Sequence, residues 1–136
     1  MKILLIEDSR FMRLAIDRIL TRGGHEVTGI ADGREGVRRA RSGSPDLILL
    51  DMMLPGLDGP NVLRELKKDA GTAGVPVVVL TALSKLNAEK LKSEGAAAYI
   101  EKSALDLEKN PDLLLEVVAR VVSTCGSSAV RATTGR

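Results

Sequence analysis

Residues 47–51 read Leu47-Ile48-Leu49-Leu50-Asp51, an uninterrupted apolar run that ends in a carboxylate. Such a run is typical of a strand that is buried on both faces of a parallel sheet. Similar runs occupy residues 3–6 and 75–80. Two further segments, residues 25–30 and 97–100, are interrupted by polar or small side chains and are typical of edge strands. The sequence therefore predicts five strands, three of them central.

Amphipathic segments separate these strands. Met12, Ile16 and Ile19 share one face of a helix that Ser9 can cap, and similar patterns follow each later strand. The five predicted helices cover approximately residues 9–21, 32–42, 60 onward, 84–95 and 110–122. An Asp32–Glu35 capping box is expected to open the second of them. The alternation predicts an α/β fold: a doubly wound, five-stranded parallel sheet in the order 2-1-3-4-5, with five helices.

Composition excludes several classes of function. A chain of 136 residues with 44% hydrophobic and 28% charged residues is one ordinary globular domain. It contains a single histidine, His25, and a single cysteine, Cys125, which leaves no internal disulfide and no multi-histidine or cysteine metal site. A net charge of +2 and 1% aromatic residues argue against nucleic acid as a partner.

The first residues and the apolar runs also bear on location. Acidic residues appear at positions 7 and 8, too early for a signal peptide, and no apolar run has the roughly 18 residues that a membrane span needs. We therefore expect a cytoplasmic protein with no membrane partner. The last segment, residues 124–136, is small and polar and is expected to be a disordered C-terminal tail, too short to be an output domain.

Polar side chains follow four of the predicted strands. Glu7 and Asp8 follow the first, Asp51 ends the third, Thr81 ends the fourth and Lys102 follows the fifth. Each has an ordinary explanation alone, such as a helix cap or a surface lysine. Because parallel strands end at one edge of a sheet, however, these groups are expected to share one crevice. Clustered carboxylates need a cation to remain ionised, and oxygen ligands suit Mg²⁺.

This set of groups is suited to phosphoryl transfer. An aspartate beside Mg²⁺, with an ammonium and a hydroxyl nearby, can attack phosphorus and form an acyl phosphate. An aspartyl phosphatase is a remote alternative, because such enzymes usually carry a second aspartate two positions after the nucleophile, where this chain has Met53. A nucleotide- or flavin-binding module is also disfavoured, since no glycine-rich loop follows the first strand.

The same residues resemble a known family. Glu7-Asp8, the segment from Asp51 to Gly59, Thr81-Ala82 and the segment from Tyr99 to Lys102 are similar to the receiver domain of bacterial two-component response regulators. The resemblance covers residues 1–123, which we take as one domain. Within the family, the chain resembles the stand-alone regulators of the chemotaxis type. It implies a flavodoxin-like fold. The family usually has proline after its lysine, whereas here Ser103 follows Lys102.

The resemblance implies a role for each site residue. Asp51 would be the phosphoacceptor, and Mg²⁺ would be held by the carboxylates of Asp8 and Asp51, the backbone carbonyl of Met53 and, through water, Glu7. Lys102 would pair with the phosphoryl group. Thr81 would donate a hydrogen bond to it, and Thr81 and Tyr99 would move together as the switch.

The implied function is that of a single-domain response regulator, not an enzyme acting on other substrates. It would accept a phosphoryl group from a sensor histidine kinase or a His phosphotransfer domain. It would then change its affinity for a downstream protein through the face formed by helix 4, strand 5 and helix 5. A phosphorelay intermediate and a receiver fragment of a longer regulator are alternatives. We expect a monomer or weak dimer.

Basic residues are frequent on the first predicted helix. They are Arg10, Arg13, Arg18 and Arg22. The ordinary explanation is a solvated face that includes an Arg13–Asp17 pair. The alternative is a docking surface for the histidine-bearing domain of the kinase, because the resemblance implies contacts there.

Overall fold

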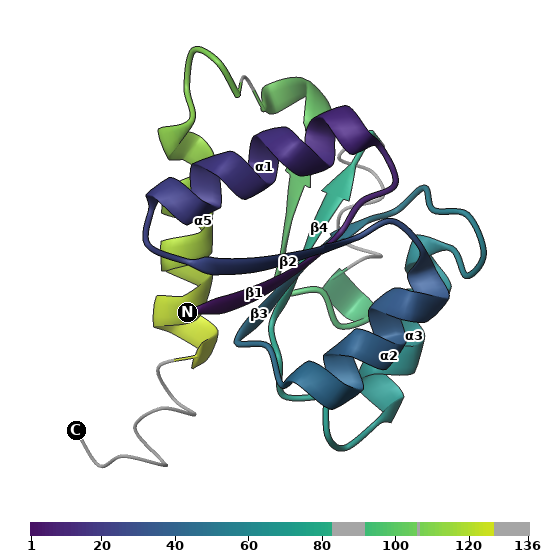
Figure 1. Ribbon diagram of the computed structural model, residues 1–136. Coiled ribbons are helices and arrows are strands. Elements are labelled where there is room, and N and C mark those ends of the chain that lie inside the picture. Colours follow the sequence, from purple (N-terminus) through teal and green to yellow (C-terminus); the bar gives the residue numbers. More distant parts are fainter. Residues whose placement is uncertain (83–91, 106, 127–136) are drawn as a thin grey trace.

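The computed structural model describes residues 1–82, 92–105 and 107–126 and contains one five-stranded sheet. All strand pairs are parallel, and the order is β2-β1-β3-β4-β5, as predicted (Figure 1). The strands are β1 (Lys2–Ile6), β2 (Glu26–Ile30), β3 (Leu47–Asp51), β4 (Val77–Thr81) and β5 (Ala98–Glu101). The two segments with mixed composition are the edge strands, which confirms that prediction.

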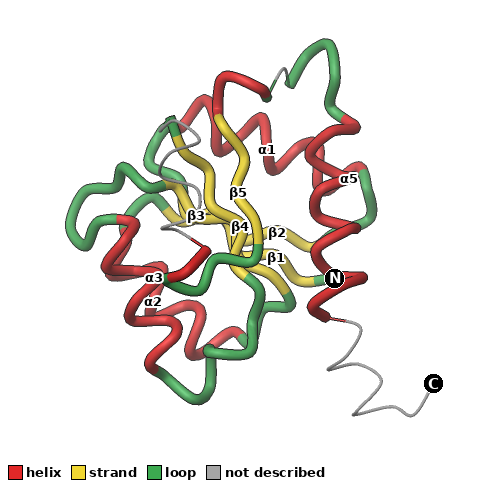
Figure 2. The backbone as a smooth tube through the Cα atoms, turned by 180° about the vertical axis from the view of Figure 1, so that it is seen from behind, coloured by secondary structure: helices red, strands yellow, loops and turns green. Residues whose placement is uncertain are grey.

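Helices cover both faces of the sheet. The described α-helices are α1 (Arg10–Arg22), α2 (Gly33–Gly43), α3 (Gly59–Lys68) and α5 (Asp112–Val121). In both views α1 and α5 lie on one face, and α2 and α3 lie on the other (Figures 1 and 2). The helix predicted over residues 84–95 falls mainly on residues 83–91, which lie outside the described residues. None of the described helices is long and apolar enough to cross a membrane.

Alternate side chains of the central strands fill two separate core layers. Ile6, Ile48 and Leu50 contribute to the layer under α2 and α3. Leu5 and Leu49 contribute to the layer under α1 and α5. Because β1, β3 and β4 are packed on both faces, the carboxyl ends of these strands are held at fixed positions relative to one another.

Side-chain caps set the starts of three helices. Ser9 Oγ accepts from the amide of Met12 at 3.3 Å, as predicted, and Asp58 Oδ1 accepts from the amide of Asn61 at 3.0 Å. Asp32 caps α2, but only half of the expected capping box forms. The carboxylate of Glu35 pairs with Arg38 and Arg39, outward along the helix, because two arginines on the next turn compete for it.

Beyond α5 the described chain ends in one further helical turn. Helix α5 continues into a π-helical turn, Val122–Gly126, which includes the first residues of the expected tail. Within it the hydroxyl of Thr124 donates to the carbonyl of Arg120 at 3.1 Å. Residues 127–136 lie outside the described residues.

The start of α2 packs directly against the loop that follows β3. A Cβ added at Gly33 would lie 1.9 Å from the carbonyl oxygen of Leu57, whereas one at Gly43 in the same helix would meet nothing within 4 Å. Gly33→Ala should therefore destabilise the fold by about 1–3 kcal/mol through overpacking against backbone. The matched variant Gly43→Ala should be neutral or slightly stabilising. Urea unfolding measures both, and equal stability of the two variants would contradict the packing.

Candidate functional site

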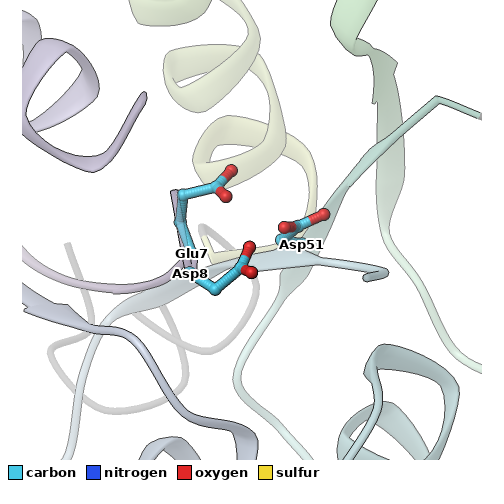
Figure 3. Close-up of side chains that lie close together, drawn as sticks. All are labelled: Glu7, Asp8 and Asp51. Atoms are coloured by element: carbon cyan, nitrogen blue, oxygen red, sulfur yellow. The ribbon is translucent and has the colours of Figure 1, made fainter. Parts of the chain in front are cut away.

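The candidate site lies where β1 and β3, the two adjacent central strands, end. Glu7 and Asp8 directly follow β1, and Asp51 is the last residue of β3. Figure 3 shows the three side chains converging from these two strands. One carboxylate oxygen from each lies within 4.8 Å of the others. The structure therefore brings together the three acidic residues that the sequence placed at one edge.

Two of these carboxylates are buried and incompletely bonded. Glu7 is 0% exposed and Asp51 is 1% exposed, whereas Asp8 faces solvent. One oxygen of each buried group accepts an amide hydrogen bond: Glu7 Oε2 from Ser9 and Asp51 Oδ1 from Met53, both at 3.1 Å. The other oxygens, Glu7 Oε1 and Asp51 Oδ2, have no hydrogen-bond donor in the described part of the chain. Buried charged acceptors of this kind are costly unless a cation compensates them.

Lys102 supplies one positive charge to this cluster. Its Nζ lies 3.1 Å from Asp51 Oδ1 and 3.3 Å from Glu7 Oε1, and its side chain is partly buried. Both contacts are ion pairs. Burial lowers the pKa of Lys102, but Asp51 and Glu7 outweigh it and the net pKa is raised. The lysine therefore remains an ammonium, and this one charge lies beside two of the three clustered carboxylates.

Among the described groups, Glu7 is the one whose pKa is shifted most by its surroundings. Burial raises its pKa from 4.5 to about 7, and the neighbouring Asp51 acts in the same direction. The amide of Ser9 and the ammonium of Lys102 oppose this shift without cancelling it. Near neutral pH Glu7 thus exchanges between its two protonation states, and a cation bound beside it would favour the carboxylate.

Thr81 and Tyr99 lie on neighbouring strands at the same side of the sheet. Thr81 is the last residue of β4 and is 2% exposed. Tyr99 pairs with Val79 in register and is half-buried. Its ring packs against the core layer of α2 and α3, and Lys92 Nζ lies 5.7 Å from the ring centroid.

Different backbone hydrogen bonds fix the segments that follow Asp51 and Lys102. Met53 is tied to Asp51 through its amide, while its side chain is 71% exposed. Lys102 begins a 3-10 turn, Lys102–Ala104, in which the amide of Leu105 donates to the carbonyl of Lys102 at 3.1 Å. Ser103 occupies the place where the family usually has proline, and all peptide bonds between described residues are trans.

The structure places Arg13 beside the acidic residues. The expected pair with Asp17 does not form, because Arg13 Nη1 donates to the carbonyl of Glu7 at 2.8 Å and to that of Asp8 at 3.4 Å. The docking surface on this helix stays a prediction. Asp17 accepts from Thr21. Helical side chains point toward the N-terminus of their helix, so Arg13 is aimed at the strand end that precedes α1. That direction is the signal that could have revealed the contact.

The raised pKa of Glu7 makes stability depend on pH. Between pH 4.5 and about 7 the folded, metal-free protein binds more protons at Glu7 than the unfolded chain does, so this residue lowers stability as pH rises. In Glu7→Gln the unfolding temperature should fall less across that range. Thermal melts in a chelator measure it, with Glu26→Gln, on an exposed edge-strand residue, as the control. Equal slopes for Glu7→Gln and the wild type would contradict the assignment.

Known proteins are similar to this chain in sequence and in fold. Residues 3–114 match the response regulator receiver domain model. Protein PilH of Pseudomonas aeruginosa is 35% identical over 103 residues, which cover 74% of this chain and 84% of PilH. The transcriptional regulatory protein AfsQ1 of Streptomyces coelicolor is 45% identical over 80 residues, which cover 59% of this chain and 34% of AfsQ1.

Solved structures agree with this. The chemotaxis response regulator CheY4 of Vibrio cholerae superposes with a TM-score of 0.80 at 28% identity, covering 88% of this chain and 97% of CheY4. NtrX of Brucella abortus gives a TM-score of 0.84 at 28% identity, over 96% of this chain and 28% of NtrX. With its flavodoxin-like sheet and its acidic cluster at the strand ends, the chain belongs to the response regulator receiver domain family.

Proposed function

We propose that this chain is a phosphoacceptor switch in which Asp51 accepts a phosphoryl group from a histidine kinase or a His phosphotransfer domain. The carrying observation is the buried Asp51 carboxylate, which has one unpartnered oxygen and lies 3.1 Å from the Lys102 ammonium. A carboxylate oxygen of Asp51 would attack the phosphorus of a phosphohistidine. The P–N bond breaks, its electron pair returns to the imidazole, and an acyl phosphate forms.

The residues present also fit a bound Mg²⁺. Three carboxylates offer oxygens within 4.8 Å, and two buried oxygens among them lack a hydrogen-bond donor in the described residues. Asp8 and Asp51 would bind the ion directly, Glu7 through water, and Met53 through its backbone carbonyl. When bound, the ion would neutralise charge on the phosphoryl oxygens. The amide of Ser9 meanwhile keeps the Glu7 carboxylate oriented.

Lys102, Thr81 and Tyr99 would convert phosphorylation into a change of shape. The Lys102 ammonium, now shared by Asp51 and Glu7, would turn to the added phosphoryl oxygens. The hydroxyl of Thr81 would donate to the same group and draw the end of β4 toward it. Tyr99, which is half-buried beside β4, would then turn inward and alter the face near β5 and α5 that meets a downstream protein.

The surface that would meet the phosphoryl donor is a groove between α1 and the connection from β5 to α5. It has a volume of about 700 Å³, and its apolar lining includes Met12, Ile19 and Leu105. Phe11 also lines it and is 76% exposed. The charged residues of the lining are two arginines, Arg18 and Arg22, and one glutamate, Glu108. An apolar lining with mainly basic charged residues suits an amphipathic helical partner with acidic residues, such as a histidine-bearing helical domain.

Such a switch could act in three settings: as a stand-alone regulator, in a phosphorelay, or within a longer regulator. The chain spans most of PilH but about a third of AfsQ1. We propose that it acts through protein contacts, as a stand-alone regulator does. A place in a phosphorelay, or within a longer regulator, uses the same acceptor chemistry and the same donor groove.

Asp51→Ala should abolish covalent labelling by a small phosphoryl donor such as acetyl phosphate, and by candidate kinases. The matched variant is Asp46→Ala, at the exposed opposite end of β3, which should be labelled like the wild type. Intact-protein mass spectrometry in the presence of Mg²⁺ measures the added phosphoryl group. Labelling that persists in Asp51→Ala at the wild-type level would overturn the proposal.

Charge reversal in the groove should separate kinase docking from chemistry. Arg18→Glu combined with Arg22→Glu should slow transfer from the kinase, because an acidic partner edge would be repelled. Labelling by acetyl phosphate should not change, since neither arginine contacts the carboxylates. Arg34→Glu, on the exposed face of α2, is the charge-matched control. Kinase rates that equal those of the wild type would place the donor elsewhere.

A further inference from the structure

We propose that Arg13 is a positioning residue that fixes the Glu7–Asp8 pair by binding its two backbone carbonyls from α1. The inference rests on the proposed metal-dependent function of the acidic cluster and concerns how that cluster is kept in place. Arg13 touches none of the three carboxylates in the described structure. Its contacts are with the chain that carries two of them, at 2.8 Å for the carbonyl of Glu7 and 3.4 Å for that of Asp8.

Helix α1 aims the arginine at this target. Ser9 caps the helix directly after Asp8, and the amide of Arg13 donates to the carbonyl of Ser9 at 2.8 Å, so Arg13 lies one turn beyond the cap. A side chain there runs back toward the helix N-terminus and reaches the preceding strand end. The guanidinium then binds carbonyls that lie beyond the last residue of β1.

The edge strand leaves room for the arginine stem. A Cβ added at Gly29 of β2 would lie 3.1 Å from both Cγ and Cδ of Arg13, close enough that the arginine stem would have to shift by a few tenths of an ångström. The next residue, Ile30, accepts a hydrogen bond from the amide of Glu7 at 2.9 Å. The peptide groups around Glu7 are thus held from two sides, by β2 through the N–H and by Arg13 through the C=O.

This restraint matters because the carboxylates repel one another. Three such groups lie within 4.8 Å of one another, and the Lys102 ammonium contacts only Glu7 and Asp51. Repulsion would therefore move the Glu7–Asp8 segment, which has passed the end of β1, away from Asp51. A pre-positioned ligand set binds a cation more tightly than one that must be assembled during binding. Arg13 resists the displacement without occupying any carboxylate oxygen.

Positioning by Arg13 would strengthen metal binding, whereas its positive charge would by itself weaken it. A guanidinium near the cluster repels a divalent cation, so on electrostatic grounds alone Arg13→Gln would tighten Mg²⁺ binding. If positioning dominates, the same substitution weakens it. The sign of the change therefore distinguishes the two effects.

The experiment compares Arg13→Gln, Arg13→Lys and a control, Arg10→Gln, on an exposed residue at the start of the same helix. Isothermal titration with Mg²⁺ should show weakening by roughly tenfold in Arg13→Gln, the low end for losing an outer-shell partner. Arg13→Lys keeps the positive charge and a single donor nitrogen, so it should recover part of the Mg²⁺ affinity that Arg13→Gln loses. Arg10→Gln should bind at least as tightly as the wild type.

A second readout uses the metal-free protein. The amide of Ser9 donates to Glu7 Oε2, so its hydrogen exchange reports the order of this segment directly. Exchange should be faster in Arg13→Gln than in Arg10→Gln at matched thermal stability. Unchanged or tighter Mg²⁺ binding, or unchanged exchange, in Arg13→Gln would overturn the positioning role. Failure of Asp51 to accept phosphate in the wild type would instead refute the proposed function and leave these two readouts intact.

Discussion

Three carboxylates packed together, with one ammonium beside two of them, are the constraint on which the rest of this structure depends. Glu7 and Asp51 are fully buried, and each retains an oxygen without a hydrogen-bond donor in the described residues. Such an arrangement opposes folding, as the raised pKa of Glu7 shows. It persists because β1 and β3 are packed on both faces and cannot separate to relieve the repulsion. The carboxylates at the carboxyl edge of the sheet therefore need a bound cation to offset their mutual repulsion.

The backbone on either side of the cluster is braced by local contacts. On the β1 side, Ser9 caps α1 and Arg13 binds the carbonyls of the acidic pair. On the β3 side, Gly59 lets the start of α3 approach the residue after Asp51, since a Cβ there would lie 2.4 Å from Met52 Cα. The contacts of Arg13 and Gly59 both position side chains through backbone atoms. They therefore occupy no carboxylate oxygen that could bind a cation or attack phosphorus. Phosphoryl transfer depends mostly on such positioning and charge compensation.

Much of this could be predicted from the sequence. The apolar runs predicted where the strands lie, and their composition distinguished the edge strands from the central ones. The parallel topology predicted that Glu7, Asp51 and Lys102 lie close together. Periodicity alone could not anticipate the backbone contact of Arg13, because a solvated arginine and one that binds backbone have the same spacing; only the direction of helical side chains points to it. The missing half of the Asp32–Glu35 box reflects competition from two arginines. The unpartnered oxygens depend on atomic positions that no pattern contains.

The demand for a cation is tested most directly by titrating the protein with Mg²⁺ at pH 8, where Glu7 is ionised, and following labelling by acetyl phosphate in the same samples. We predict one Mg²⁺ site per chain, lost in Asp51→Asn, and labelling of the wild type that rises with occupancy of that site and stops in a chelator. Labelling of Asp51 at an undiminished rate in the chelator, or absence of Mg²⁺ binding to the wild type, would contradict the account.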